Sequence, residues 1–203
     1  MLTGAAVDCE RILEGFLGQP VNTITSVGFV LAGLVAFARG AGPPTATLIA
    51  AVGVGSIAFH GPMPPWGEFL HDLTIGWMLV WVILSERRQW RLWSLVVVGL
   101  LMFTPTIADP VQALLAVVAV VVVWRSRHPH RLWILALLTI GGAVGRLSRT
   151  GWPWCNPDSI WQGHGLWHLA AAAALALWAV PPRQPSTRGF AGSVSGPGPT
   201  RSR

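Results

Sequence analysis

The sequence predicts an all-α, polytopic membrane protein with seven transmembrane helices, and three observations support this prediction. First, 52% of its 203 residues are hydrophobic and only 11% are charged, whereas a soluble domain has about 25% charged residues. Second, apolar stretches recur along the chain, each near the ~20 residues that a spanning helix needs. Third, proline and glycine separate these stretches, as expected for turns between helices.

Seven apolar segments follow a polar N-terminal segment, residues 1–21, which we expect to lie outside the bilayer. A break at Asp109-Pro110 separates the fourth segment from the fifth. The tail, residues 181–203, is rich in Pro, Gly, Ser and Arg, so we expect it to be disordered. The membrane domain is thus residues 22–180, and its segments are 22–39, 45–61, 69–85, 90–107, 110–125, 131–147 and 160–180.

Arginine distribution predicts the orientation of the chain. The positive-inside rule assigns the arginine-rich side of a membrane protein to the cytoplasm. Arg146 and Arg149 are exceptions to a pattern that otherwise places the N-terminus outside and the C-terminus in the cytoplasm. The net charge of +6 comes from arginines, which the predicted topology places mostly in cytoplasmic loops. We therefore do not expect nucleic acid as a partner. The arginines of the cytoplasmic side are Arg39, Arg87, Arg88, Arg91, Arg125, Arg127, Arg131, Arg183 and Arg188.

The residue composition also indicates a source. The chain has no Tyr, all of its basic residues are Arg, and Gly and Trp are abundant. This usage is typical of a GC-rich bacterial genome, which predicts a multi-pass protein of the bacterial plasma membrane.

The last apolar segment begins with the clearest functional signal, Gly163-His164-Gly165-Leu166-Trp167-His168. Histidines at i and i+4 share one helix face and can bind one metal ion. Ionisable residues within a membrane segment are costly and indicate a functional site. The helical zinc motif of metalloproteases carries a Glu between its histidines. No acid lies between His164 and His168, so a third ligand and a base must come from elsewhere.

The predicted topology brings more polar side chains to the same outer helix ends. Segment two ends with Ser56 and His60, and segment three begins with His71 and Asp72. Three neutral histidines with one open position form a catalytic zinc site. Asp72 is then a candidate base, or an orienter of the bound water.

Each of these polar residues also has a simpler interpretation. Ser56 can bond its own helix backbone, as serines in membrane helices commonly do. His71 fits a residue at the membrane interface, and Asp72 fits a helix cap, since acids favour helix N-termini. The joint placement of three histidines, an acid and a hydroxyl at one depth favours the metal site.

The chain resembles the alkaline ceramidase family, which belongs to a membrane hydrolase superfamily that also includes the progestin and adiponectin receptors. The motifs come in the family's order and extend from residue 9 to residue 168. The segment around the Cys-Glu pair is shorter than in eukaryotic members, as in bacterial relatives. The resemblance implies seven helices and a zinc-dependent amidase that splits a lipid such as ceramide into sphingoid base and fatty acid. It rests on Cys9-Glu10, Asn22-Thr23 with Ser26, Gly55-Ser56, His60, Asp72 and the 163–168 stretch.

By resemblance, His60, His164 and His168 match the Zn²⁺ ligands. Ser56 and Asp72 match the polar partners of the bound water, and we expect Asp72 to accept its proton while Ser56 helps to stabilise the oxyanion. The expected substrate is ceramide or another N-acyl lipid in the membrane.

The family also implies a disulfide between Cys9 and Cys155, both of which fall on the outer, oxidising side. Eukaryotic members bind calcium through acidic and amide residues around the Cys-Glu pair. Here only Glu10 is clearly retained, and Asp8 stands where Trp is typical. The sequence therefore gives little support for a calcium site.

Two other functions fit the same residues. One is a non-enzymatic lipid receptor or sensor of the superfamily, in which zinc is structural. The other is a haem or metal carrier, because histidine pairs also occur in such proteins. Ser56 and Asp72 favour the enzyme, since haem ligation would need neither.

Overall fold

The computed structural model describes residues 4–85 and 87–180, and this part of the chain is all-α. A short 3-10 helix, η1 (Gly4–Asp8), is followed by seven α-helices in the described residues. The predicted tail, 181–203, lies outside the described residues. The α-helices are α1 (Pro20–Ala38), α2 (Pro43–His60), α3 (Gly67–Ile83), α4 (Arg88–Met102), α5 (Pro105–Arg125), α6 (Arg131–Leu147) and α7 (Gly163–Ala179).

The helix boundaries agree with the predicted segments to within a few residues, except between α4 and α5. The predicted break at Asp109-Pro110 is wrong, because α4 already ends at Met102 and α5 begins at Pro105. Proline suits the first position of a helix, where its missing N–H leaves no hydrogen bond unmade. Pro110 lies inside α5, where it removes one backbone hydrogen bond without ending the helix.

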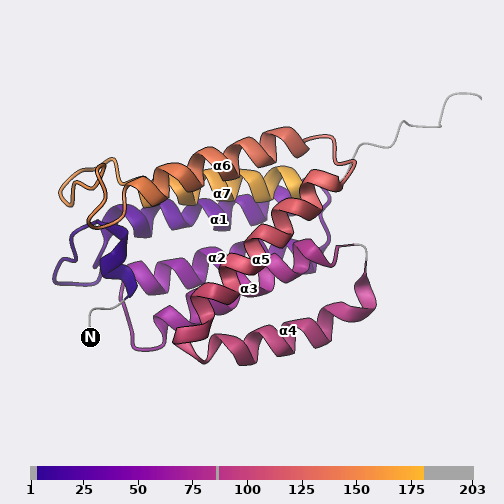
Figure 1. Cartoon of the computed structure of the whole chain (residues 1–203), viewed down its shortest axis with the longest axis horizontal. Coiled ribbons are helices and arrows are strands. Elements are labelled where there is room, and N and C mark those ends of the chain that lie inside the picture. The colour runs from indigo at the N-terminus through magenta and orange to yellow at the C-terminus, as the bar shows by residue number, and fades with distance from the viewer. Residues whose placement is uncertain (1–3, 86, 181–203) are drawn as a thin grey trace, which may run out of the picture.

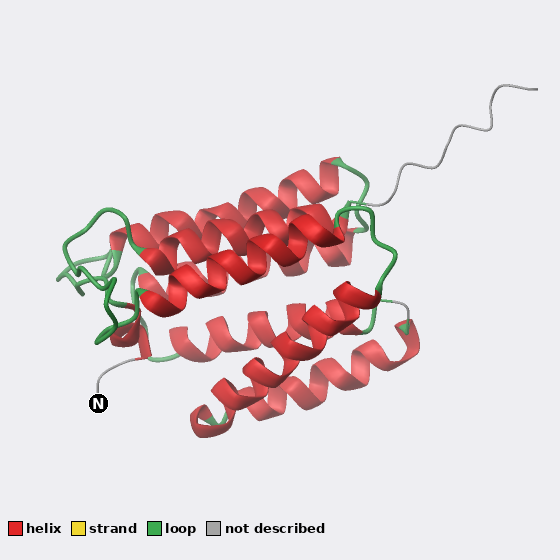
Figure 2. Cartoon of the chain, turned by 45° about the horizontal axis from the view of Figure 1, so that its top comes forward, coloured by secondary structure: helices red, strands yellow, loops and turns green. Residues whose placement is uncertain are grey.

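Consecutive helices alternate in direction, so the bundle has two distinct ends (Figure 1). α1 packs against both α2 and α7, α6 lies along α7, and α3 lies along α2. α5 packs mainly on α3, and α4 lies at the edge of the molecule (Figure 2). The N-terminal segment, the end of α2 and the beginnings of α3 and α7 therefore lie together at one end.

A glycine lets α2 and α3 approach closely at this end. A Cβ atom on Gly55 would lie 2.9 Å from the carbonyl oxygen of Leu70 and 3.1 Å from the Cα of His71. Only glycine leaves room for such an approach. The contact brings the last turn of α2, which contains Ser56 and His60, against the first turns of α3.

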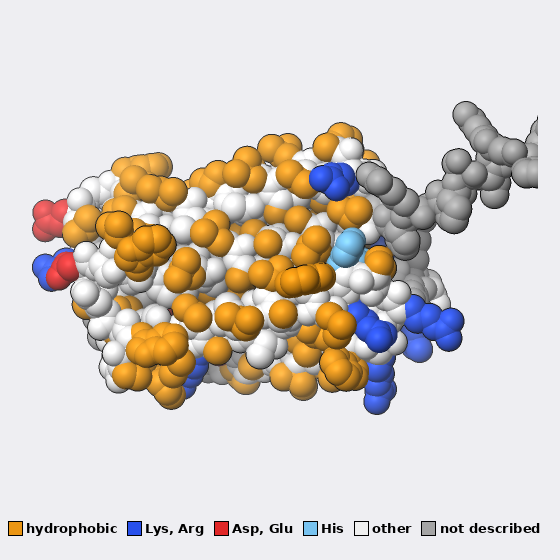
Figure 3. Space-filling model, turned by 90° about the horizontal axis from the view of Figure 1, so that it is seen from above, with side chains coloured by type: hydrophobic (Ala, Val, Ile, Leu, Met, Phe, Trp, Pro, Cys, Tyr) orange, Lys and Arg blue, Asp and Glu red, His pale blue; other side chains and the backbone are white. Residues whose placement is uncertain are grey.

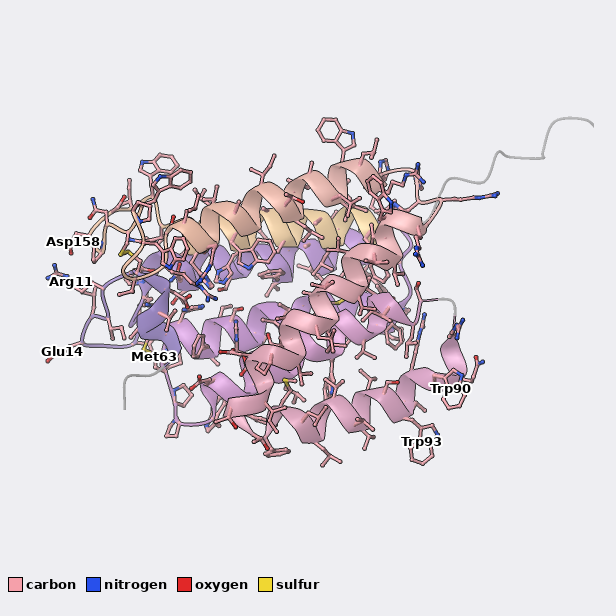
Figure 4. All side chains as sticks on the ribbon, viewed as in Figure 1. Arg11, Glu14, Met63, Trp90, Trp93 and Asp158 are labelled. Carbon is pink, nitrogen blue, oxygen red and sulfur yellow. A yellow bond between two sulfur atoms is a disulfide. The ribbon has the colours of Figure 1, made fainter. Side chains whose placement is uncertain are left out.

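The surface of the bundle is largely apolar. Within the part of the chain that the structure describes, three stretches are long and apolar enough to cross a membrane: Pro20–Ala38, Pro43–His60 and Thr106–Arg125. Figure 3 shows apolar side chains along the whole length of one face, with acidic side chains at one end and most of the arginines at the other. Figure 4 labels Arg11 and Asp158 at the acidic end and Trp90 and Trp93 at the opposite end.

Candidate metal centre

Three histidines from two helices form a buried cluster that could hold a metal ion. His60 is the last residue of α2, and His164 and His168 lie in the first two turns of α7. Their ring centroids are 4.5–5.2 Å apart, and the candidate ligand atoms lie within 4.8 Å of one another. The predicted ligand set is thus brought together.

The unpaired nitrogens of this cluster fit a metal. The Nε2 atoms of His60 and His164 are buried and have no hydrogen-bond partner among the described residues. An unsatisfied buried polar atom costs about 1–3 kcal/mol, and coordination would remove that cost. Neutral imidazole nitrogens are common ligands of zinc, so His60, His164 and His168 would hold such an ion.

Gln19 orients the His60 ring. Its side-chain oxygen lies 2.6 Å from His60 Nδ1, and its amide nitrogen donates to the carbonyl oxygens of Ala5 and Glu10. These two bonds fix which end of the Gln19 amide is oxygen, so His60 Nδ1 must carry the proton. Nε2 of His60 is then a free acceptor for a metal.

The first turns of α1 orient the His168 ring in the same way. Nδ1 of His168 lies 3.2 Å from the carbonyl oxygen of Asn22 and 3.2 Å from the Ser26 hydroxyl. A carbonyl oxygen only accepts hydrogen bonds, so Nδ1 carries the proton here too. His168 therefore also offers Nε2 to the cluster.

Asp8, the last residue of η1, faces the third histidine. Its Oδ1 lies 3.2 Å from His164 Nδ1, and the Asp8 residue is only 5% exposed. Burial raises the pKa of Asp8 to about 6, while His71 and Arg149 oppose the rise and Asp109 adds to it. At neutral pH most of the carboxyl group is therefore ionised and can accept a hydrogen bond from His164.

All three outer contacts come from the N-terminal segment and the start of α1, and the contacts of Asp8 and Gln19 were not predicted from the sequence. The available signal was a series of polar residues around the beginning of an apolar stretch: Gln19, Asn22 and Ser26 are 0% exposed. Buried polar residues at such a position need partners, and here the side chains of Gln19 and Ser26 and the backbone carbonyl of Asn22 contact the ligand rings.

The predicted disulfide is confirmed, and Glu10 beside it caps α1. Cys9 and Cys155 are bonded, with their Cα atoms 5.6 Å apart. The two oxygens of Glu10 accept the backbone N–H groups of Val21 and Asn22, at 2.6 and 2.8 Å. Backbone N–H groups in the first turn of a helix have no partner within the helix, so Glu10 supplies the hydrogen-bond acceptors for two of them.

Three other candidate residues lie near the cluster at the ends of α2 and α3. Ser56 is 1% exposed and lies one turn before His60 on the same helix. The His71 ring stacks on Phe59 and lies edge-on to His60, with centroids 6.0 Å apart. Asp72 Oδ1 lies 3.1 Å from His71 Nδ1.

The structure does not support the alternative interpretations of His71 and Asp72. Asp72 is not a helix cap, because α3 begins at Gly67 and its N-terminus has no side-chain cap. The side chain of His71 is 14% exposed and packs within the protein, unlike a residue at an open interface. Asp72 is therefore connected to the cluster through its neighbour His71.

The fold and the site together define an all-α protein with a buried three-histidine cluster at one end of its helices. Comparison of the chain with protein families, with curated proteins and with solved structures gave no match.

Proposed function

We propose that the chain is a multi-pass membrane hydrolase that uses Zn²⁺ to cleave the amide bond of an N-acyl lipid such as ceramide. The observation that carries the proposal is the convergence of His60, His164 and His168, each with Nδ1 facing an oxygen and Nε2 available. Three neutral imidazoles with one open position are the donor set of catalytic zinc.

Bound zinc would supply Lewis-acid activation of water and of the substrate carbonyl at neutral pH. We assign proton transfer to Asp72 acting with His71, because the Asp72 carboxylate contacts His71 Nδ1 and leaves Nε2 of that ring available. The Ser56 hydroxyl, one turn from His60, is the candidate donor to the developing oxyanion.

A membrane location supports a lipid substrate. Side chains such as Leu31, Leu100 and Leu114 are 56–65% exposed on the outside of the bundle, where acyl chains would solvate them. We propose seven spans with the N-terminus outside, because arginines such as Arg39, Arg125 and Arg131 gather at one end of the helices. A protease added to intact spheroplasts should spare a tag placed after Arg203, and cleavage of that tag would overturn this orientation.

The cluster geometry argues against haem. The three ring centroids lie 4.5–5.2 Å apart and the rings converge on one point. A haem held by two histidines lies as a wide plate between them, with one ring on each face, whereas here all three rings lie close to one another. A single metal ion needs no such space.

The decisive experiment is lipid hydrolysis by purified, zinc-loaded protein. A panel of N-acyl lipids that includes ceramide should yield free fatty acid, followed by mass spectrometry, and His164→Ala should abolish release. If a zinc-loaded wild type releases no fatty acid from any of them, the hydrolase proposal fails and a lipid receptor with structural zinc becomes the better explanation.

A further inference from the structure

Three consecutive residues of the N-terminal segment hold three different parts of the molecule. Asp8 contacts His164 of α7, Cys9 is bonded to Cys155 in the loop between α6 and α7, and Glu10 caps α1. We call residues 8–10 the strap. It connects the two helices whose residues form or orient most of the metal centre.

The strap turns sharply at Cys9. Cys9 has a φ of 71°, and the N–H of Glu10 donates to the carbonyl oxygen of Asp8 at 2.9 Å. This combination is a γ-turn with a positive φ, which is rare and strained for a residue other than glycine. The turn lets Asp8 and Glu10 face different elements.

Two contacts hold Cys9 in this conformation. One is the disulfide to Cys155, and the other is a hydrogen bond from Cys9 N–H to the Thr150 hydroxyl at 3.2 Å. Such strain persists only where the surroundings enforce it, and it is concentrated at functional sites. Without the disulfide, relaxation at Cys9 would move the neighbouring carboxylate.

Asp8 is an unusual residue to bury. Among the described residues its side chain has one close polar contact, His164 Nδ1 at 3.2 Å. A buried carboxylate is costly unless it is paired and hydrogen-bonded. The cost is offset when the partner is a metal ligand, because a carboxylate fixes the ring tautomer and raises the basicity of the other nitrogen.

We propose that Asp8 is a positioning residue for His164 and that the Cys9–Cys155 disulfide keeps it in place, so that the affinity of the centre for zinc depends on both. This inference rests on the metal centre of the proposed function and does not depend on the lipid that is cleaved. It assigns the strap, which lies outside the seven α-helices, a direct part in metal binding.

The test is a zinc affinity measurement on the full chain in detergent. The protein is stripped of metal and titrated with Zn²⁺ in competition with a chromophoric chelator. Asp8→Asn should bind about 10-fold more weakly and Asp8→Ala up to about 100-fold more weakly, the range typical of outer partners of ligand histidines. The visible absorption of bound Co²⁺ should change in both variants, because the ligand field at the metal depends on the His164 ring.

Asp158→Asn is the matched control. Asp158 is an exposed carboxylate on the loop that carries Cys155, and it pairs with Arg11 at 2.7 Å. Its loss removes a charge from the same end of the molecule without touching the centre, so zinc affinity should not change. If Asp8→Asn binds zinc as tightly as wild type, the inference is overturned. If the wild type itself binds no zinc, the proposed metal centre is wrong. That result comes from the wild type alone, so it is distinguishable from a result that overturns the role of Asp8.

The disulfide is tested by replacing both cysteines with serine, because reduction would create thiolates that bind zinc themselves. The double variant should also lose affinity, and adding Asp8→Asn to it should cost less than in wild type, since both changes disturb the same contact. Wild-type affinity in the double variant would overturn the proposed dependence on the disulfide. The double cysteine variant also keeps the proposal testable if Asp8→Asn does not fold, because it displaces the Asp8 side chain without replacing it.

Discussion

The two sides of the bundle use different kinds of interaction. Most buried polar side chains of the described residues lie in the N-terminal segment, α1, α2 and α7, and none lies in α4 or α5. In α4 and α5 the buried side chains are apolar, as in the small cluster of Val98, Met102 and Ala108 with Val80 of α3. The first side therefore combines apolar packing with directional contacts, whereas the second depends mainly on packing.

This difference indicates where a substitution should change chemistry. Hydrogen bonds such as those that His60 Nδ1 donates to the Gln19 side-chain oxygen and His168 Nδ1 donates to the Asn22 carbonyl oxygen fix ring orientations to within a narrow range. Exposed apolar side chains such as Leu92 and Leu100 on α4 face outward and are exchangeable for other apolar groups. The effects of substitutions in the two regions should thus differ in kind as well as in size.

The largest expected effect is the loss of metal from the polar side. His164→Ala removes one of three candidate ligands, so zinc content should fall from one per chain to nearly none, with activity lost at the same time. His130→Ala, which removes a histidine just before α6 and outside the cluster, should keep full zinc. Elemental analysis of both proteins gives the comparison. Full zinc in His164→Ala would show that the ligand assignment is wrong.

The next largest effect is a loss of rate without loss of metal. Asp72→Asn is nearly isosteric and leaves the three candidate ligands unchanged, so zinc content should stay at the wild-type value. Loss of general-base help should lower kcat by on the order of 10²–10⁴. Both quantities are measured on the same preparations with any lipid that the wild type cleaves.

His71→Ala separates the two members of the proton-transfer pair. If Asp72 acts through the His71 ring that it contacts, this variant should lose as much rate as Asp72→Asn and also keep its zinc. If Asp72→Asn hydrolyses the lipid at the wild-type rate, Asp72 takes no part in proton transfer. In that case the contact with His71 serves structure only.

A smaller effect compares packing on the two sides. Val52 in α2 is 4% exposed, whereas Val117 in α5 is 62% exposed. Val52→Ala should destabilise by about 1–3 kcal/mol, because a cavity remains among packed helices. Val117→Ala should change stability by less than about 0.5 kcal/mol. Thermal unfolding in one detergent measures both, and equal shifts would contradict the assignment of α5's outer face to lipid.

Much of this architecture was predictable from the sequence, because helices and ligand spacing are local. The i, i+4 relation of His164 and His168 and the apolar segment lengths needed no tertiary information. The break predicted at Pro110 was wrong, because a proline near the start of a helix does not by itself end it, and Pro105 begins α5 instead. Glu10 belonged to a recognised motif, but its role as the cap of α1 depends on how the chain folds back.

The outer contacts of the ligands could not be predicted. Asp8 and His164 are separated by most of the chain, and their contact depends on the path of a loop segment. No periodic pattern encodes such a path. The contact of His71 with the cluster could not be predicted either, because nothing in the sequence shows that Gly55 lets α3 approach α2 so closely.

The smallest expected effect is a pH dependence that belongs to the polar side alone. Burial raises the pKa of Glu10 above its ordinary value of 4.5, although the N–H groups of Asn22 and Val21 act in the opposite direction. A raised pKa means that the folded protein favours the protonated acid. The resulting stabilisation is present below the unfolded pKa and is lost as pH rises through the folded pKa.

The measurement is the difference in stability between wild type and Glu10→Gln, both free of metal, from pH 4 upward. Wild type should lose stability relative to the variant as pH rises, and the difference should level off once Glu10 is ionised. Glu14→Gln, at an exposed position further along the same segment (Figure 4), should change stability by less than about 0.5 kcal/mol at pH 7. A relative gain by wild type over this range would mean that the two N–H groups outweigh burial, and that ionised Glu10 stabilises the start of α1.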